Sequence, residues 1–157
     1  MSAVREAQRA NHRPRTWVFW AQASMAGIGL LVALYLTWLK LADASALCAG
    51  IGDCETVQNS AYSEIAGIPV ALLGAGMYAG VLLFLGIRHA AHPSWAALAL
   101  GAQVALVTAG LLFSAYLTYV ELFVIYAICP WCVVSALLVT GLFALTLHEW
   151  HHHIAQR

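Results

Sequence analysis

The sequence Cys129-Pro130-Trp131-Cys132 places two cysteines in a C-x-x-C arrangement, directly before the uncharged apolar run of residues 133–147. Cysteines this close together can form and break a disulfide within one turn of chain. If a helix begins here, Pro130 suits its first position, where a missing N–H costs nothing. The partial positive charge of a helix N-terminus would also stabilise a thiolate. A redox-active pair is therefore the leading hypothesis, with half of a metal site or a structural disulfide as alternatives.

The other two of the four cysteines, Cys48 and Cys54, lie in the long polar loop of residues 40–66. Disulfide exchange proceeds by attack of a thiolate on a sulfur, through a mixed disulfide. A loop pair that reaches a soluble partner and a helix pair that lies next to lipid would together form a two-stage relay. The chain carries no haem motif and no Gly-rich nucleotide loop. A lipid-soluble quinone is therefore the simplest final electron acceptor.

The composition indicates a membrane protein. Of the 157 residues, 62% are hydrophobic and 9% are charged, which is too apolar for a soluble domain. The formal net charge is zero, so it points to no nucleic acid and no acidic partner. One membrane domain accounts for the whole length. Paired cysteines in such a protein suggest disulfide chemistry on an oxidising face of the membrane.

Four uncharged apolar segments are long enough to be membrane spans, at about residues 17–39, 67–87, 95–120 and 127–147. A helix rises about 1.5 Å per residue, so roughly 20 residues cross a hydrocarbon core of about 30 Å. Residues 44–46 resemble a signal-peptidase site, but the first segment exceeds the usual apolar region of about 7–15 residues. We expect an all-α integral membrane protein, a four-transmembrane-helix bundle with a periplasmic loop at residues 40–66 between helices 1 and 2.

The distribution of positive charge predicts the orientation. One basic residue, Lys40, falls in the loop of residues 40–66, and the other six fall in segments on the opposite side: Arg5, Arg9, Arg13, Arg15, Arg88 and Arg157. By the positive-inside rule both termini are cytoplasmic, with residues 1–16 as a basic arm and residues 148–157 as a tail. Both cysteine pairs then face the same outer side. Nucleic-acid binding by the arm is the weaker alternative.

The ordered set of motifs resembles the bacterial branch of the vitamin K epoxide reductase (VKOR) family. The resemblance covers about residues 17–147 and is carried by Cys48-x5-Cys54, Ser60, Gly67-Ile68-Pro69, Gly74, Tyr78 and the CPWC element. It implies a four-helix bundle around a quinone, ubiquinone or menaquinone. It also implies a multi-pass protein of the bacterial cytoplasmic (inner) membrane, with its active site facing the periplasm or cell exterior and membrane lipid around it.

The resemblance further implies a role for each cysteine. Cys48 resembles the shuttle cysteine that meets the partner, and Cys54 resembles the cysteine that relays electrons to the active pair. Cys129 would form a transient disulfide with Cys54, and Cys132 would be the thiolate beside the quinone ring. The loop residue Ser60 would help place the loop over the site. The candidate quinone contacts are Cys132, Ser60, Tyr78, Trp131 and Tyr116.

Two positions depart from the animal members of the family. Val70 stands where they have a quinone-binding asparagine, and Ala136 stands where they have a tyrosine. Both changes favour plain quinone reduction over epoxide reduction. Some relatives carry a fused thioredoxin-like domain, whereas this chain ends at Arg157, so we expect a separate periplasmic thioredoxin-like, DsbA-like partner. The resemblance implies that net electron flow oxidises this partner and supports disulfide bond formation.

Other hypotheses remain open at this stage. A metal-binding or transporting membrane protein could use the cysteine pairs, but it would need acids or histidines along a path within the spans, and none of the four segments contains one. A structural module with two static disulfides is a further alternative. The histidine-rich segment that begins at His148 is expected to be an interfacial tail. Gln103, inside the third span, is expected to form helix–helix hydrogen bonds.

Overall fold

The computed structural model describes residues 2–42, 44, 52–90 and 93–155, with side chains from residue 16 onward except that of Pro93. Its long helices are α1 (Ser2–Leu41), α3 (Val70–Ala90), α4 (Pro93–Val120) and α5 (Pro130–Ala155). Shorter elements are helix α2 (Cys54–Gln58), strands β1 (Glu64–Ile65) and β2 (Ile68–Pro69), and a π-helical turn, η1 (Glu121–Ile125). Within the described residues, four segments are long and apolar enough to cross a membrane: Thr16–Leu41, Val70–Ala90, Ser94–Ile125 and Pro130–Ala155. The predicted all-α, four-span fold is confirmed.

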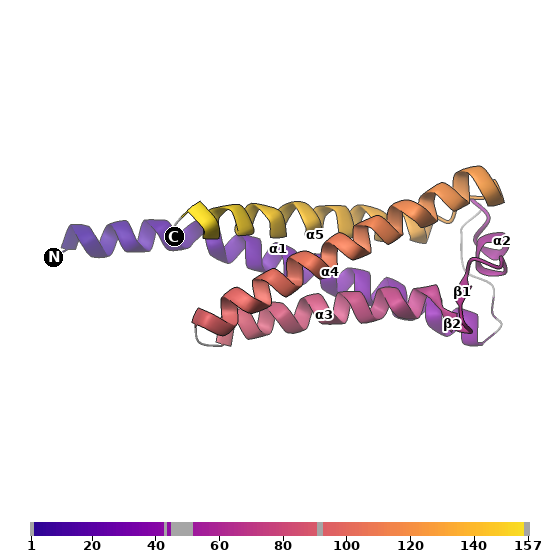
Figure 1. Cartoon of the computed structure of the whole chain (residues 1–157), viewed down its shortest axis with the longest axis horizontal. Helices are drawn as coiled ribbons and strands as arrows, with labels where there is room; N and C mark the ends of the chain where they lie inside the picture. Colours follow the sequence, from indigo (N-terminus) through magenta and orange to yellow (C-terminus); the bar gives the residue numbers. More distant parts are fainter. Residues whose placement is uncertain (1, 43, 45–51, 91–92, 156–157) are drawn as a thin grey trace.

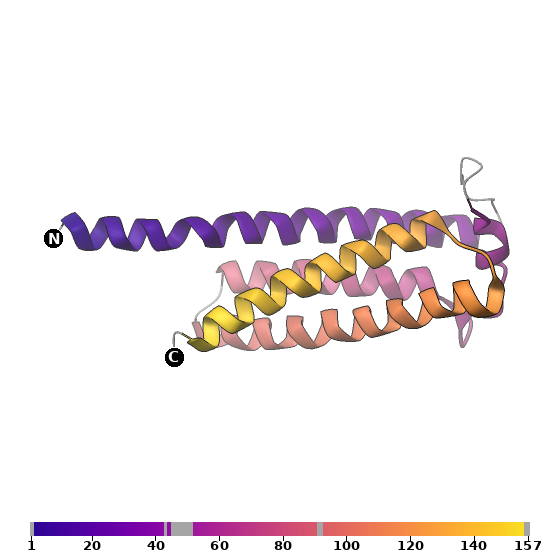
Figure 2. The same ribbon diagram turned by 90° about the horizontal axis from the view of Figure 1, so that it is seen from above.

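The four long helices form a closed ring. Helix α1 packs against α3 and α5, and α4 packs against the same two helices. Both ends of the chain, with the end of α3 and the start of α4, lie at one end of the bundle (Figures 1 and 2). Helix α2 and the two strands lie at the opposite end, next to η1 and the start of α5 (Figure 1). This second end carries the described cysteines.

The second span begins three residues later than predicted, at Val70, because a small hairpin precedes it. Ile65 and Ile68 pair in antiparallel register across this hairpin. Ala66 and Gly67 between them have φ of 53° and 79°. Positive φ at both central residues is the pattern of the tight turns that suit twisted hairpins. The glycine that was expected to open the helix therefore supplies a turn instead.

The ends of the helices also differ from those predicted. Helix α5 begins at Pro130, which occupies the first helical position as expected, and not at residue 127. It continues to Ala155, so most of the predicted tail is helical, and His148 and His152 contact one turn apart with ring centroids 4.5 Å apart. Residues 2–15, predicted as an arm, likewise extend α1. A fall in hydropathy marks the edge of a membrane, but it does not interrupt helical hydrogen bonds.

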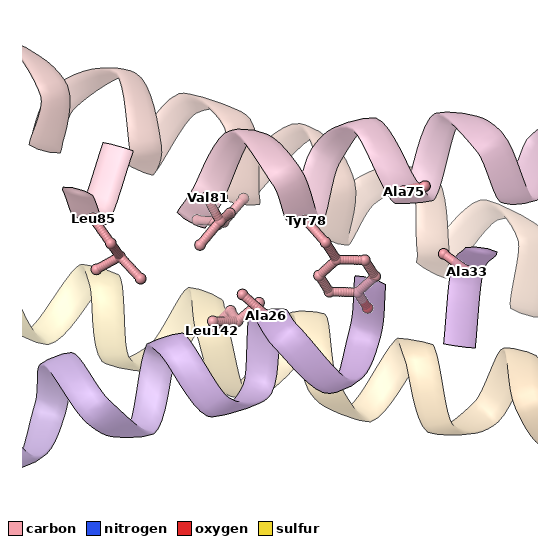
Figure 3. Packing of buried hydrophobic residues seen from close by; sticks show 8 residues of the cluster. Ala26, Ala33, Ala75, Tyr78, Val81, Leu85 and Leu142 are labelled. Atoms are coloured by element: carbon pink, nitrogen blue, oxygen red, sulfur yellow. The ribbon is translucent and has the colours of Figure 1, made fainter. Parts of the chain in front are cut away.

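The centre of the bundle is built from small residues around one aromatic ring. Figure 3 shows Tyr78 reaching from α3 toward α1, where Ala26 and Ala33 leave room for it. The side chains of Tyr78 and Leu142 are fully buried. The Tyr78 hydroxyl donates to the carbonyl of Ser135 on α5 over 3.0 Å, which satisfies its polar end. One side chain thus joins three helices.

Gly29 of α1 allows the close approach of Tyr78. A Cβ at Gly29 would overlap the Tyr78 ring, whereas a Cβ at Gly27 would meet open space. We expect Gly29→Ala to destabilise the folded protein by about 1–3 kcal/mol through overpacking. The matched variant Gly27→Ala should be neutral or stabilising by about 0.5–1 kcal/mol, because alanine favours a helix interior. Melting temperatures in one detergent would test this, and equal values for the two variants would contradict it.

A buried polar network joins all four helices at the end where the termini lie. Arg88 of α3 forms an ion pair of 2.7 Å with Glu149 of α5 and donates to Gln103 of α4 over 2.8 Å. Gln103 in turn donates to Gln22 of α1 over 3.1 Å and to Thr146 of α5 over 3.3 Å. The predicted helix–helix bonding of Gln103 is confirmed. Arg88, predicted in a loop, lies in the last turn of α3 and points inward. Because an unpaired polar group in an apolar interior is costly, this network fixes how the helices align.

Candidate active site

The CPWC element lies at the point where the chain enters α5. Cys129 precedes the helix and its carbonyl accepts the N–H of Val133 over 3.1 Å, while Cys132 lies in the first turn. The Cys129 side chain is fully buried and that of Cys132 is partly buried. Both are free thiols, within hydrogen-bond reach of each other. The partial positive charge of the α5 N-terminus favours a thiolate at this point, whereas the charge of Glu121 opposes it at Cys129.

The π-helical turn η1 brings a carboxylate under this pair. The turn ends at Tyr126, whose φ of 55° turns the chain back toward the bundle, and Ala127 N–H donates to the Glu121 carbonyl over 3.1 Å. The Glu121 carboxylate accepts the backbone N–H of Cys129 over 3.2 Å and also meets the Cys132 thiol. Glu121 is only 6% exposed. The sequence motifs did not single out Glu121. The signal that could have found it is a lone carboxylate between apolar segments, eight residues before Cys129.

The start of α2 lies directly over the CPWC element. The backbone N–H of Asp53 donates to the carbonyl of Ile128 over 3.1 Å. Gly52 has φ of 82°, and a Cβ there would overlap that same carbonyl. Asp53 also caps α2, and hydrogen bonds from the Thr56 side chain and backbone hold the pKa of its carboxyl below the usual range. Cys54, the first residue of α2, is buried and its sulfur is in a disulfide. Cys48 lies outside the described residues.

Helix α2 and the β1–β2 hairpin form a cover over this end of the bundle (Figure 1). A cavity of about 380 Å³ opens beneath this cover, between all four long helices. Its walls are mostly aliphatic and aromatic, and the two CPWC cysteines line one part of it. Lys40 of α1 reaches its rim, where it pairs with Glu64 over 3.3 Å and donates to the Gln58 carbonyl over 2.6 Å. These bonds tie the end of α1 to α2 and the hairpin. A mainly apolar cavity of this size with a few convergent polar groups is typical of small-molecule sites.

Comparison with known proteins agrees with this arrangement. The sequence model of the vitamin K epoxide reductase family matches residues 20–147. The chain belongs to this family. The thiol-disulfide oxidoreductase LTO1 of Arabidopsis thaliana is 32% identical over 126 residues, or 76% of this chain and 33% of that protein. The chain thus spans about a third of the length of this relative. The resemblance inferred from the cysteine pattern is confirmed, and the protein is a VKOR-family multi-pass membrane protein.

Three of the five candidate quinone contacts line the cavity: Cys132, Ser60 and Tyr78. Ser60 lies under the cover, where its hydroxyl donates to the Val57 carbonyl over 2.7 Å. Tyr78 lies in the wall, with its hydroxyl 2.9 Å from the Ser135 hydroxyl. Val70, at the position of the animal asparagine, also lines the cavity and offers no hydrogen bond from its side chain.

The other two expected contacts, Trp131 and Tyr116, are not brought to this cavity. Neither is among the described residues that line it. Trp131 packs edge-on against Tyr35 of α1, with ring centroids 5.5 Å apart. Tyr116 is half exposed on the outside of α4 and stacks on Phe113. Sequence spacing placed both near the right level of the membrane, but it did not specify which helix face they occupy.

The hydrogen bond between the two thiols makes Cys129 more acidic than a free cysteine. The hydrogen bond from the Cys132 thiol lowers the pKa of Cys129, and this outweighs burial and the nearby charge of Glu121. A lowered pKa means that the Cys129 thiolate persists to lower pH than that of a free cysteine. In Cys132→Ala the donor is lost, so the midpoint of Cys129 alkylation by iodoacetamide should move to higher pH. Mass spectrometry of the alkylated peptide across pH would measure this, and an unchanged midpoint would contradict it.

Proposed function

We propose that this protein is a quinone-dependent thiol oxidoreductase that reoxidises a soluble thioredoxin-fold, DsbA-like protein. One observation carries the proposal: the free thiols of Cys129 and Cys132 line an apolar cavity within the membrane bundle, under a cover that begins with Cys54. The relative from Arabidopsis thaliana is a thiol-disulfide oxidoreductase, which supports the thiol chemistry. The family membership supports the use of a quinone.

In this proposal electrons enter at a loop pair formed by Cys48 and Cys54. The partner dithiol reduces this pair, and the Cys54 thiolate attacks the Cys129 sulfur of an oxidised CPWC pair. Cys132 leaves as a thiolate, and Cys48 then displaces Cys129 from Cys54. The result is a loop disulfide and a CPWC dithiol. The described cysteines fit this state, with Cys54 in a disulfide and Cys129 and Cys132 free.

The cavity fits a quinone as the final acceptor. Its apolar wall would hold a ring and the start of a lipid tail, and the Cys132 thiol would face the ring. A bound quinone, ubiquinone or menaquinone, supplies an acceptor for two electrons and two protons. The CPWC dithiol gives up these electrons and protons and closes to a disulfide. Because the Val70 side chain cannot donate a hydrogen bond where animal relatives have an asparagine, we favour quinone reduction without epoxide reduction.

We place the cysteine end of the bundle on the periplasmic side of a bacterial inner membrane. Residues 1–16 and 148–157 are then the cytoplasmic arm and tail, and residues 17–147 are the membrane domain with its loop at 40–66. The excess of arginine on one side supports this orientation. The location of both chain ends at the end of the bundle away from α2 also supports it.

The proposal is tested with the purified full chain in lipid nanodiscs. A reduced thioredoxin-fold oxidase serves as the electron donor and menadione or decylubiquinone as the acceptor. We expect one quinone reduced for each partner disulfide formed, at a rate proportional to the protein concentration. Partner oxidation that does not require quinone, or no oxidation at all, would contradict the proposed function.

A further inference from the structure

Glu121 is a buried acid that the thiol relay does not yet use. Within the described chain it is the only carboxyl-bearing residue that lines the cavity. One of its oxygens accepts the Cys129 N–H over 3.2 Å, and its side chain also meets the Cys132 thiol. The π-helical turn fixes its position, since Ala127 N–H bonds back to the Glu121 carbonyl. The carboxyl group therefore touches a sulfur that reacts.

The Cys132 thiol proton lies where the Glu121 carboxylate could accept it. This thiol has two acceptors within reach, the Cys129 sulfur and the Glu121 carboxylate. It carries one proton and can donate to only one of them at a time. A neutral amide would cap the Cys129 N–H equally well, but it could not accept a proton. A carboxylate here is thus placed for proton transfer as well as for hydrogen bonding.

We propose that Glu121 is a catalytic residue, the base that takes the Cys132 proton when the CPWC dithiol closes to a disulfide. This inference rests on the proposed function and adds the proton acceptor. Two electrons leave the sulfurs for the quinone as the Cys129–Cys132 bond forms. The Cys132 proton moves to a Glu121 oxygen and then to the quinone. The Cys129 proton goes to water, and a bound quinone would draw its second proton from water, so protons and electrons balance.

The other charged groups near η1 are occupied or turned away. Helix α2 packs against η1, and its Asp53 carboxylate is bonded to Thr56 while its Glu55 side chain is exposed. Across the cavity, the Lys40 ammonium is paired with Glu64. Helix α4 continues into η1 without a charged residue of its own. Among the described residues, the groups that titrate against Glu121 are therefore the two cysteines.

Glu121→Gln tests the proposal, because glutamine keeps the size and the acceptor oxygen but cannot take up a proton. The dithiol protein is oxidised in a single turnover, first by menadione and separately by the aromatic disulfide 4,4′-dithiodipyridine, whose stable thione leaving group drives the exchange to completion. We expect both closures to slow by about 100-fold, the lower range for a lost general base. Glu121→Asp should restore part of the rate. Glu55→Gln, an exposed acid on α2, should react at the wild-type rate.

A second readout separates catalysis from support of the fold. The Glu121 charge opposes ionisation of Cys129, so its removal should lower the pKa of Cys129 further, below the value already lowered mainly by the Cys132 hydrogen bond. Cys129 alkylation in Glu121→Gln should therefore persist to lower pH while closure is slower.

Closure at the wild-type rate, or a parallel loss of closure, alkylation and thermal stability, would overturn the proposal. If the wild-type protein closes with the disulfide reagent but never reduces menadione, the quinone function fails. In that case the role of Glu121 is decided by whether Glu121→Gln forms the Cys129–Cys132 disulfide more slowly than the wild-type protein with the disulfide reagent.

Discussion

Replacing Cys132 with serine should reduce the rate of quinone reduction by about 1,000-fold or more, to the protein-free background. A serine hydroxyl cannot form the CPWC disulfide, so the two electrons have no route from sulfur to the acceptor. The loss should be equal with the protein partner and with chemical reductant as the electron source. Menadione absorbance in a stopped-flow instrument would measure it.

A lipid-facing change on the same helix provides the control. Thr140 is exposed on α5, and its hydroxyl donates to the Ala136 carbonyl one turn before it. Thr140→Ala should keep the rate within about twofold, as surface changes away from special features usually do. If Cys132→Ser retains quinone reduction while it melts at the wild-type temperature, the CPWC pair is not the electron donor.

Replacing Cys54 with serine should separate the two stages of the relay. Turnover driven by the thioredoxin-fold partner should fall to background, because the loop can no longer hand electrons to Cys129. A CPWC pair that has been reduced chemically beforehand should still reduce one equivalent of menadione, within about twofold of the wild-type rate, since α2 makes no bond to the quinone in this scheme. Partner-driven turnover should be measured beside this single-turnover reaction.

The comparison with Cys132→Ser makes this prediction specific. That variant should lose both reactions, whereas Cys54→Ser should lose only the partner-driven one. If Cys54→Ser keeps full turnover with the partner, the partner reduces the CPWC pair directly and the loop is not a relay. If it loses the single-turnover reaction as well, Cys54 is needed to hold the site together.

The membrane spans could be predicted from the sequence because a long apolar run has few alternatives. Pro130 was expected at the first position of any helix that begins at the CPWC element, because proline suits that position, although the predicted span began at residue 127. Ser60 and Tyr78 were placed at the cavity by the family resemblance. These predictions use information carried by neighbouring residues or by an ordered motif.

The remaining features depend on contacts between segments far apart in the sequence. Hydropathy does not say which face of a helix turns inward, so Tyr116 and Trp131 were expected at a cavity that they do not line. Arg88 was assigned to a loop because its partner, Glu149, lies 61 residues away. Glu121 could be noticed in the sequence as a lone carboxylate between apolar segments, but its contact with Cys129 depends on the π-helical turn. Sequence spacing alone encodes none of these pairings.

The most direct test of the relay is a disulfide map of the Cys48→Ser/Cys132→Ser double variant after mild oxidation. Only Cys54 and Cys129 remain, and a disulfide forms only when the two Cα atoms come within about 4.4–6.8 Å. We predict that mass spectrometry under non-reducing conditions finds these two residues in one linked peptide in most molecules. Two separate peptides with free thiols, or a link only between different molecules, would show that the loop never reaches the CPWC pair.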